Sequence, residues 1–471
     1  MSGADPTAWS LCEAAEAIAA GRVSSEELVR ACLARIERTQ PTLNSFLAVE
    51  AEPALAAARR ADAERARGRL RGPLHGVPLA HKDMFYRAGQ LCSCGSAIRR
   101  DWRAEVTCTL LERLEAAGAI TLGRLNMNEF ATGPHGLNQH FGHCRNPWNP
   151  AHITGGSSSG AGAAVAARQV YGALGSDTGG SVRLPAAFCG VVGLKPTQGR
   201  VSRYGMLPLS FSMDQAGPLA RTVRDGARLL RSVAGHDPRD ATSSHEPVPD
   251  YEAALEGPIR GMRIGLPANY YGDGMSEPVR AALQAAQSAF RDLGAELREV
   301  RLPDHDLMYP LGNMVSRTEA AAAHREWLAA RPQDYSPQVR ARISIGLFTP
   351  ATHYLAALRL RGAILQRVMD DVYSQVDVLL TPATSSAAPP IAEADVGDSP
   401  GFLELLAAIG RCTQPANYLG LPALALPMGF SVAGLPLSLQ LIGRPFGEAR
   451  LLRLGHAYQQ ATDWHTRAPA L

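Results

Sequence analysis

Lysine is nearly absent from this sequence of 471 residues. Of its 47 basic side chains only Lys82 and Lys195 are lysines, and the other 45 (47 − 2) are arginines. Arginine stays protonated and cannot act as a base, whereas a buried lysine can lose its proton near neutral pH. A lysine retained in such a chain is therefore a candidate for chemistry. Lys82 follows the apolar residues 76–80, which predict a buried strand end that would desolvate its amine.

Long apolar runs, clustered charge and a cysteine framework are also missing. No run approaches the roughly 18 apolar residues of a membrane-spanning helix, so we expect no membrane partner. The net charge is only +3 and the arginines are dispersed, which argues against nucleic acid as a partner. The eight cysteines form no C-x-x-C motif or disulfide pattern and no signal peptide is recognised. We therefore expect a cytoplasmic protein.

Two glycine loops rich in hydroxyl groups stand out among the features that are present. Residues 154–162 read TGGSSSGAG and residues 175–183 read GSDTGGSVR. Glycine allows positive φ and lets backbone N–H groups approach a ligand, so each loop can present hydroxyls and bare amides together. Acyl transfer needs that combination. Ser157 and Ser181 are 24 residues apart (181 − 157), and Lys82 lies 75 residues before Ser157 (157 − 82).

Together these motifs resemble the amidase signature family. The family pattern is a lysine in a short Lys-Asp segment, then Gly-Gly-Ser-Ser-Gly-Gly, then Asp-x-Gly-Gly-Ser-x-Arg-x-Pro. Other stretches similar to the family extend the resemblance over nearly the whole chain: residues 126–131, 145–148, 189–197, 420–423 and 434–443. Two positions depart from the pattern, because Ser159 replaces a usual glycine and His81 a usual aliphatic residue. Neither departure removes a catalytic atom.

The resemblance implies an amidohydrolase that works through an acyl-enzyme intermediate. Ser181 would be the nucleophile, and Ser157 would take its proton and pass one to the neutral amine of Lys82. In the family the peptide bond before the bridging serine is cis, here between Gly156 and Ser157. The family acts on amides, ureas, carbamates and esters, and the sequence does not choose among these substrates.

Further loop residues would support this triad. The backbone N–H groups of Thr178, Gly179 and Gly180 would form the oxyanion hole. A second group would hold the loops in place, namely Ser158, Asp177 and Arg183. We expect a small-molecule amide substrate, no cofactor and no metal, and a homodimer is left open.

For the fold, the resemblance implies a single large α/β domain with a mixed sheet of about eleven strands between helical layers. The residue pattern itself alternates between helix and strand, as in α/β proteins. It predicts helices within residues 8–69 and over 107–117 and 276–293, and strands over 119–122, 263–266, 376–380 and 437–441. The expected segments are a helical part at 1–70 packed on the core, the catalytic core at 71–235, a variable substrate-pocket insert at 236–360, and a C-terminal part at 361–471 that completes the sheet.

The insert contains apolar and aromatic candidates for a pocket wall, although core or surface positions compete for the same residues. These candidates are Tyr270, Tyr271, Met308, Tyr309, Met314, Tyr335, Phe348 and Tyr354.

One alternative within the family is the glutaminase subunit of an aminoacyl-tRNA amidotransferase, which would be a partner-bound component. Its glutamine pocket has an aspartate just before an aromatic-Thr pair, and Gly410 stands at that place here. The arginine of that glutamine pocket corresponds to Arg342. Without the acid, the amine of glutamine would lose its counter-charge, so a free-standing amidase is the preferred interpretation.

Alternatives outside the family fit less well. Residues 156–160 match the G-x-S-x-G elbow of α/β-hydrolase esterases, with Ser158 as nucleophile, but no apolar strand leads into them. The glycine loop lacks the G-K-[ST] ending of a nucleotide-binding loop. His135, His140, His143 and Cys144 lie within ten residues, but their spacing fits no common zinc pattern.

Overall fold

The computed structural model describes residues 5–397, 399 and 401–471. Within them, eleven strands form one mixed sheet in the order β1-β3-β2-β4-β6-β5-β10-β11-β9-β7-β8. The strands are β1 Phe46–Val49, β2 Pro78–Lys82, β3 Ile120–Leu125, β4 Gly172–Asp177, β5 Val192–Lys195, β6 Gln215–Ala220, β7 Arg263–Pro267, β8 Glu296–Val300, β9 Val378–Pro382, β10 Ala423–Phe430 and β11 Pro436–Gly443. This sheet confirms the predicted α/β fold with about eleven strands.

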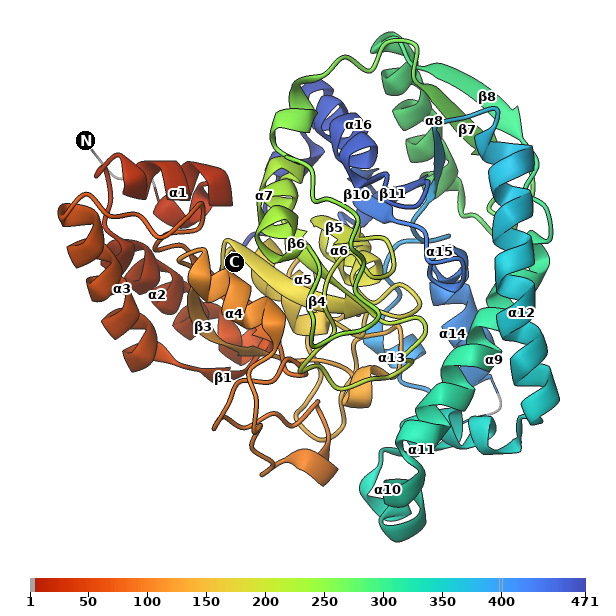
Figure 1. The fold of residues 1–471 in the computed structure, drawn as a ribbon, viewed down its shortest axis with the longest axis horizontal. Helices are drawn as coiled ribbons and strands as arrows, with labels where there is room; N and C mark the ends of the chain where they lie inside the picture. The colour runs from red at the N-terminus through yellow and green to blue at the C-terminus, as the bar shows by residue number, and fades with distance from the viewer. Residues whose placement is uncertain (1–4, 398, 400) are drawn as a thin grey trace.

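Sixteen α-helices accompany the sheet in the described residues, and the long helices α9 and α12 lie at the opposite end of the molecule from α1–α3 (Figure 1). The helices are α1 Leu11–Ala19, α2 Ser25–Leu43, α3 Ala51–Ala66, α4 Thr109–Ala116, α5 Ser159–Ala166, α6 Arg183–Cys189, α7 Val223–Val233, α8 Glu277–Asp292, α9 His305–Ala323, α10 Arg325–Ala330, α11 Pro337–Ser344, α12 Ala351–Val368, α13 Ile391–Ala394, α14 Phe402–Gly410, α15 Gln414–Tyr418 and α16 Glu448–Ala461. No helix among the described residues combines the length and apolar character needed to cross a bilayer.

The N-terminal residues 8–69 are mainly helical as predicted, with one exception. Helices α1 and α2 begin with capping boxes at Ser10 and Ser24, in which the serine side chain and a glutamate three residues later satisfy the first N–H groups. The exception is β1, which lies between α2 and α3 and pairs antiparallel with β3. A four-residue edge strand has too little periodicity to be recognised, because its partner lies far away in the sequence.

Most other predicted elements are present with shifted ends. The helix expected at 276–293 is α8, which starts after its N-cap Ser276 and buries Val279, Leu283, Ala286 and Phe290 on one face. The helix expected at 107–117 is α4. The strands expected at 119–122, 263–266, 376–380 and 437–441 correspond to β3, β7, β9 and β11.

The strand order brings distant loops to one edge of the sheet. Strand β2 runs parallel to β4, with Leu79 opposite Gly172, so the carboxyl ends of both strands lie together. Lys82 ends β2 and Asp177 ends β4. Strand β6 runs antiparallel to β4 with Gln215 opposite Asp177, and this brings the residue before β6 to the same edge. Ligand sites of α/β sheets commonly lie at such carboxyl ends.

The segment 236–360 contributes both to the sheet and to the region above the site. Its strands β7 and β8 form one end of the sheet, and helices α9 and α11 follow them in the chain. Figure 1 shows these helices beside α14, which comes from the C-terminal part. The division into the four segments 1–70, 71–235, 236–360 and 361–471 stays a prediction.

Candidate active site

A buried lysine and two serines form a polar cluster at the carboxyl ends of β2 and β4. Lys82 Nζ donates to Ser157 Oγ at 2.7 Å and to Ser176 Oγ at 2.8 Å. Lys82 and Ser157 have no exposed surface. The peptide bond between Gly156 and Ser157 is cis. The structure therefore brings together two of the three predicted catalytic residues through a direct hydrogen bond.

The environment of Lys82 favours the neutral amine. Burial lowers the pKa of Lys82 to about 7, although the carboxylates of Asp214 and Asp177 oppose this by favouring the cation. Asp83, its neighbour in sequence, instead accepts from Arg124 Nη1 at 2.6 Å. The amine can thus exchange protons near neutral pH, which an arginine could not do.

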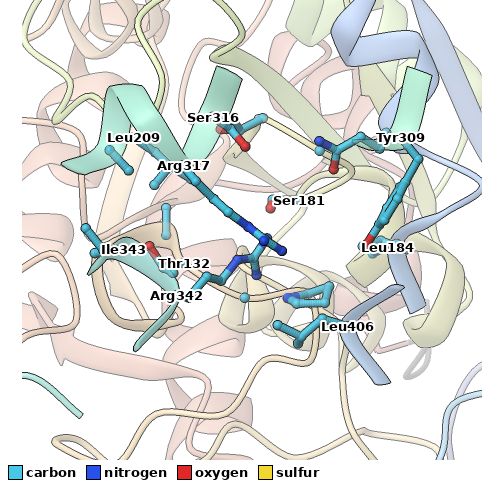
Figure 2. A pocket seen from close by; sticks show the side chains of 18 residues that line it. Thr132, Ser181, Leu184, Leu209, Tyr309, Ser316, Arg317, Arg342, Ile343 and Leu406 are labelled. Atoms are coloured by element: carbon cyan, nitrogen blue, oxygen red, sulfur yellow. The ribbon is translucent and has the colours of Figure 1, made fainter. Parts of the chain in front are cut away.

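Ser181, the predicted nucleophile, lies just before α6 and lines a pocket (Figure 2). Its carbonyl accepts from Ser158 N at 3.3 Å, which ties the two glycine loops together. The residue is 8% exposed, so its hydroxyl is reachable from the pocket, unlike that of Ser157. Across the described chain, no hydrogen bond joins the hydroxyl groups of Ser181 and Ser157 in this state.

The backbone N–H groups around Ser181 differ in availability. Gly180 N donates to Asp177 Oδ1 at 2.8 Å, so this member of the predicted oxyanion hole already has an acceptor. The N–H groups of Thr178, Gly179 and Ser181 have no acceptor within the described residues. Three unsatisfied donors beside a pocket can hold a developing negative charge. The predicted set therefore changes in one member, with Ser181 in place of Gly180.

Asp177 and Arg183 form a buried ion pair that fixes this loop. Arg183 Nη2 lies 3.0 Å from Asp177 Oδ1, and both side chains are fully buried. Burial acts to raise the pKa of Asp177, but the charge and hydrogen bonds of Arg183 outweigh it and lower the pKa to about 2. Asn417 Nδ2 also donates to Asp177 Oδ1 at 2.8 Å, and Arg183 donates to Gln440 Oε1 at 2.5 Å. The pair thereby connects the loop after β4 to α15 and β11.

Ser158 connects the first glycine loop to β4. Its hydroxyl donates to Ser176 O at 3.2 Å and accepts from Ser176 N at 3.2 Å. Gly175 permits this approach, because a Cβ there would lie 2.7 Å from Ser158 Oγ. Ser158 is thus occupied by backbone groups and completely buried, which disfavours it as the nucleophile of an esterase elbow.

Asp214 is a buried acid at this site that the sequence did not identify. Its Oδ1 accepts from Thr178 Oγ1 at 2.5 Å, and its Oδ2 accepts from the backbone N–H groups of Leu209 and Ser210 at 2.9 Å. Burial raises the pKa of Asp214 to about 6, against the lowering effect of the hydrogen bond from Thr178. The acid therefore anchors the oxyanion loop and acts electrostatically on Lys82.

The pocket above Ser181 has a cavity volume of about 610 Å³ including its mouth, which is in the range of small-molecule sites. It is bounded by Thr132, Leu184, Leu209, Tyr309, Ser316, Arg317, Arg342, Ile343, Leu406, Gly410 and Gln414, besides the oxyanion loop. Figure 2 shows the side chains of Arg317 and Arg342 extending toward Ser181. Helices α9 and α11 supply most of the polar wall, so the 236–360 segment does contribute to the pocket.

Only one of the predicted wall residues, Tyr309, lines this pocket in the described structure. Tyr270, Tyr271 and Met308 are buried in a separate apolar cluster against which Met314 and Tyr354 pack. Tyr335 instead bonds His324, and Phe348 is 83% exposed. These seven candidates were wrong because aromatic character alone does not separate core from cavity.

The histidine-rich stretch belongs to ordinary polar contacts. His135 Nε2 lies 2.5 Å from Gln338 Oε1, His140 contacts Glu129 at 2.9 Å, and His143 contacts Asp395 at 3.3 Å. Cys144 is buried. No cluster of three metal-ligating side chains occurs in the residues that the structure describes.

Several site residues escaped the sequence reasoning, namely Ser176, Asp214, Arg317 and Gln414. Ser176 directly precedes Asp177, so the alternation of β4 could have identified it as a side chain on the opposite face from Asp177. Asp214 reaches the site only through the antiparallel pairing of β4 with β6. Arg317 is one of 45 arginines, and its composition carries no signal.

Comparison with known proteins identifies the class and then the family. The fold and the relatives define an enzyme that acts on amide carbon–nitrogen bonds. The Amidase family matches residues 27–452, and the chain belongs to this family. The A subunit of the glutamyl-tRNA(Gln) amidotransferase of Chloroflexus aurantiacus is 45% identical over 97% of both chains. Its counterpart from Methylococcus capsulatus is 42% identical over 98% of both.

Solved structures agree with this assignment. A chain from an inhibitor-bound vestigial protein complex, which reveals the origins of an s-triazine catabolic enzyme, has a TM-score of 0.89 and 36% identity over 96% of this chain and 98% of that one. A peptide amidase in complex with chymostatin has a TM-score of 0.86 and 31% identity over 98% and 99%. The A subunit of the glutamyl-tRNA(Gln) amidotransferase of Thermotoga maritima has a TM-score of 0.82 and 32% identity over 98% and 96%.

Proposed function

We propose that this protein hydrolyses small amides through an acyl-enzyme formed on Ser181. The observation that carries the proposal is the 2.7 Å hydrogen bond between Lys82 Nζ and Ser157 Oγ, buried behind a pocket that Ser181 lines. A neutral amine joined to a hydroxyl is a proton acceptor with a built-in relay. The relay is protected from water, so its proton goes to the reacting atoms.

The first half-reaction transfers the acyl group. Ser181 Oγ attacks the amide carbonyl carbon while its proton moves to Ser157 Oγ, and the Ser157 proton moves to Lys82 Nζ. The carbonyl oxygen becomes an oxyanion that accepts from the N–H groups of Thr178, Gly179 and Ser181, where one donor is worth about 3 kcal/mol. The C–N bond then breaks, and the protons return through Ser157 to the leaving nitrogen.

The second half-reaction releases the acid. Water attacks the ester carbon, and its proton passes through Ser157 to Lys82 as before. Collapse of the tetrahedral intermediate expels Ser181 Oγ, which regains a proton through the same relay. The products are a carboxylic acid and ammonia or an amine, and no cofactor is required for the balance.

A covalent label combined with one substitution tests this mechanism. Phenylmethylsulfonyl fluoride should add one sulfonyl group per chain, mapped to Ser181 by peptide mass spectrometry. Ser181→Ala should lower ammonia release from a hydrolysed amide at least a thousandfold with an unchanged melting temperature. A label on Ser158, or turnover above a thousandth of the wild-type rate in Ser181→Ala, would move the nucleophile elsewhere.

A second candidate is the glutaminase subunit of a tRNA-dependent amidotransferase. The observation that favours it is the 45% identity, over 97% of both chains, to the A subunit of a glutamyl-tRNA(Gln) amidotransferase, so the comparisons support this alternative more than a free-standing amidase. Such a component would pass ammonia to an assembly and would need partner proteins. The pocket argues the other way, because Gly410 and no acid faces its interior among the described wall residues.

Glutamine turnover separates the two candidates. A glutaminase component should release ammonia from glutamine in preference to amides without an α-amino group, and it should be isolated with partner proteins. A free-standing amidase should turn over other small amides as the purified chain alone. The homodimer and the cytoplasmic location stay predictions.

A further inference from the structure

Two arginines that enter the pocket have no protein counter-charge there. Arg317 comes from α9 and Arg342 from α11, and both line the cavity that contains Ser181 (Figure 2). Neither forms an ion pair or a side-chain hydrogen bond within the described residues, and Arg317 Nε and Arg342 Nη1 are buried without an acceptor. Buried guanidinium nitrogens without acceptors are costly, and this cost is relieved when a ligand supplies the missing acceptor.

The electrostatics of the two arginines indicate that they act on each other. Burial lowers the pKa of Arg342 to about 10, and the neighbouring charge of Arg317 adds to this effect. Glu319 lies two residues from Arg317 but is occupied by Ser210 Oγ at 2.5 Å and Tyr354 OH at 2.8 Å. No aspartate or glutamate belongs to the described wall of the cavity. The pocket is therefore cationic, with its acceptors missing.

We propose that the pocket takes an amide whose acyl part carries a carboxylate and no ammonium group. Resting on the proposed hydrolysis, this inference names the substrate class for the same site. A carboxylate has the planar pair of oxygens that the guanidinium fork binds in bidentate fashion. Its carboxylate end would lie on Arg317 and Arg342 while the amide end reaches Ser181.

Gly410 explains why an amino acid amide is excluded. The residue ends α14 and lines the cavity, and a Cβ at this position would meet no atom within 4 Å. There is room for an acidic side chain, but the position carries none. An α-ammonium group of glutamine would then face two cations without an acid to balance it, which disfavours its binding.

Matched amides of five carbons test the charge requirement. Glutaramate has a carboxylate only, L-glutamine adds an ammonium group, and pentanamide has neither, while all three release ammonia. We expect kcat/KM for glutaramate to exceed the values for the other two at least tenfold. Succinamate, asparagine and butanamide form a shorter trio for a smaller cavity. Equal or better use of the neutral amide or the amino acid in both trios would overturn the proposal.

Variants connect the preference to the named residues. Arg317→Gln and Arg342→Gln should each lower the ratio of acidic to neutral amide turnover at least tenfold, whereas Arg342→Lys should lower it less. The matched control is Arg340→Gln, because Arg340 is an exposed arginine on the same helix and should leave the ratio unchanged. Gly410→Asp should raise the ratio of glutamine to glutaramate turnover at least tenfold. Unchanged ratios in all these variants would refute the assignment.

A binding measurement separates this inference from the proposed hydrolysis. Calorimetry with Ser181→Ala, which retains both arginines, should give a Kd for glutaramate at least tenfold below that of pentanamide. If the acid binds in this way but the wild type releases no ammonia from it, the anion site stands and the proposed hydrolysis fails. If ammonia is released through Ser181 but binding shows no preference for the acid, the anion site fails alone.

Discussion

A single side chain, Lys82, sets the pH range in which the proposed mechanism works. Burial lowers its pKa to about 7, and only the neutral amine can accept the proton of Ser157. Below this pKa the lysine is a cation and the relay is blocked, so kcat/KM for a neutral amide should rise through one ionisation near pH 7 and level off above it. Initial rates between pH 5 and 9 measure this.

The substitutions of Lys82 supply the control for that profile. Lys82→Ala should lose the rising limb together with most of the activity, and Lys82→Arg should be equally damaging, because a guanidinium keeps the charge but cannot be neutral. Activity rescued by arginine, or a flat wild-type profile with a substrate that does not titrate, would contradict a titrating lysine.

Asp214 should tune the same ionisation from across β6. Its carboxylate favours the Lys82 cation, so Asp214→Asn should lower the lysine pKa further and move the midpoint of the limb to a more acidic pH. The matched control is Asp83→Asn, which removes a buried acid adjacent to Lys82 in sequence but bonded to Arg124. The midpoint should stay in place in this control. A shift in Asp83→Asn and none in Asp214→Asn would reverse the assignment.

The elements around the site depend on the ion pair that connects the loop after β4 to its neighbours. Removing one partner of a fully buried pair leaves the other charge uncompensated, which costs about 3–5 kcal/mol. Asp177→Asn should therefore lower the free energy of unfolding by about this amount and lower kcat, because the oxyanion loop loses its anchor. Urea unfolding and initial rates measure the two effects.

A half-exposed pair in the same sheet is the control for that prediction. Asp377 pairs with Arg263 at 3.0 Å near β7, where both side chains retain contact with solvent. Asp377→Asn should cost no more than about 1 kcal/mol and leave kcat unchanged. If both variants lose equal stability, the buried network around Arg183 contributes nothing specific.

At the element scale, the sequence predicted what depends on local pattern. The apolar spacing of Val279, Leu283, Ala286 and Phe290 predicted the buried face of α8, because one helix face is read directly from positions three and four apart. Strand β1 was missed because its stability comes from pairing with β3, a partner remote in sequence. Motif spacing brought Ser157, Ser181 and Lys82 forward as candidates, whereas the pocket wall could not be predicted from composition.

The whole molecule explains why those pocket residues are invisible in the sequence. Lys82, Asp214 and Arg317 are separated by more than a hundred residues each, and they meet only because eleven strands close one sheet and α9 reaches back over its edge. A sheet of mixed strands places loops by strand order, which no local pattern specifies. The site is thus a property of the complete domain rather than of any one segment.

Burying two lysines also gives the whole domain a pH-dependent stability, and Lys195 allows this to be tested without touching the proposed triad. Burial lowers the pKa of Lys195 to about 7, and the charge of Arg183 acts in the same direction. Between pH 7 and about 10.4 the unfolded lysine binds a proton that the folded one does not, so the contribution of Lys195 to stability must rise with pH in this window.

Lys195→Met removes this dependence and keeps a side chain of similar length. The free energy of unfolding of the wild type, measured relative to Lys195→Met in urea, should therefore increase by about 2 kcal/mol from pH 7 to pH 9. All other groups are common to the two proteins, so their titration cancels in the difference. A difference that does not change with pH would mean that Lys195 remains a cation in the folded protein, where Asp177 and Glu448 favour the charged form.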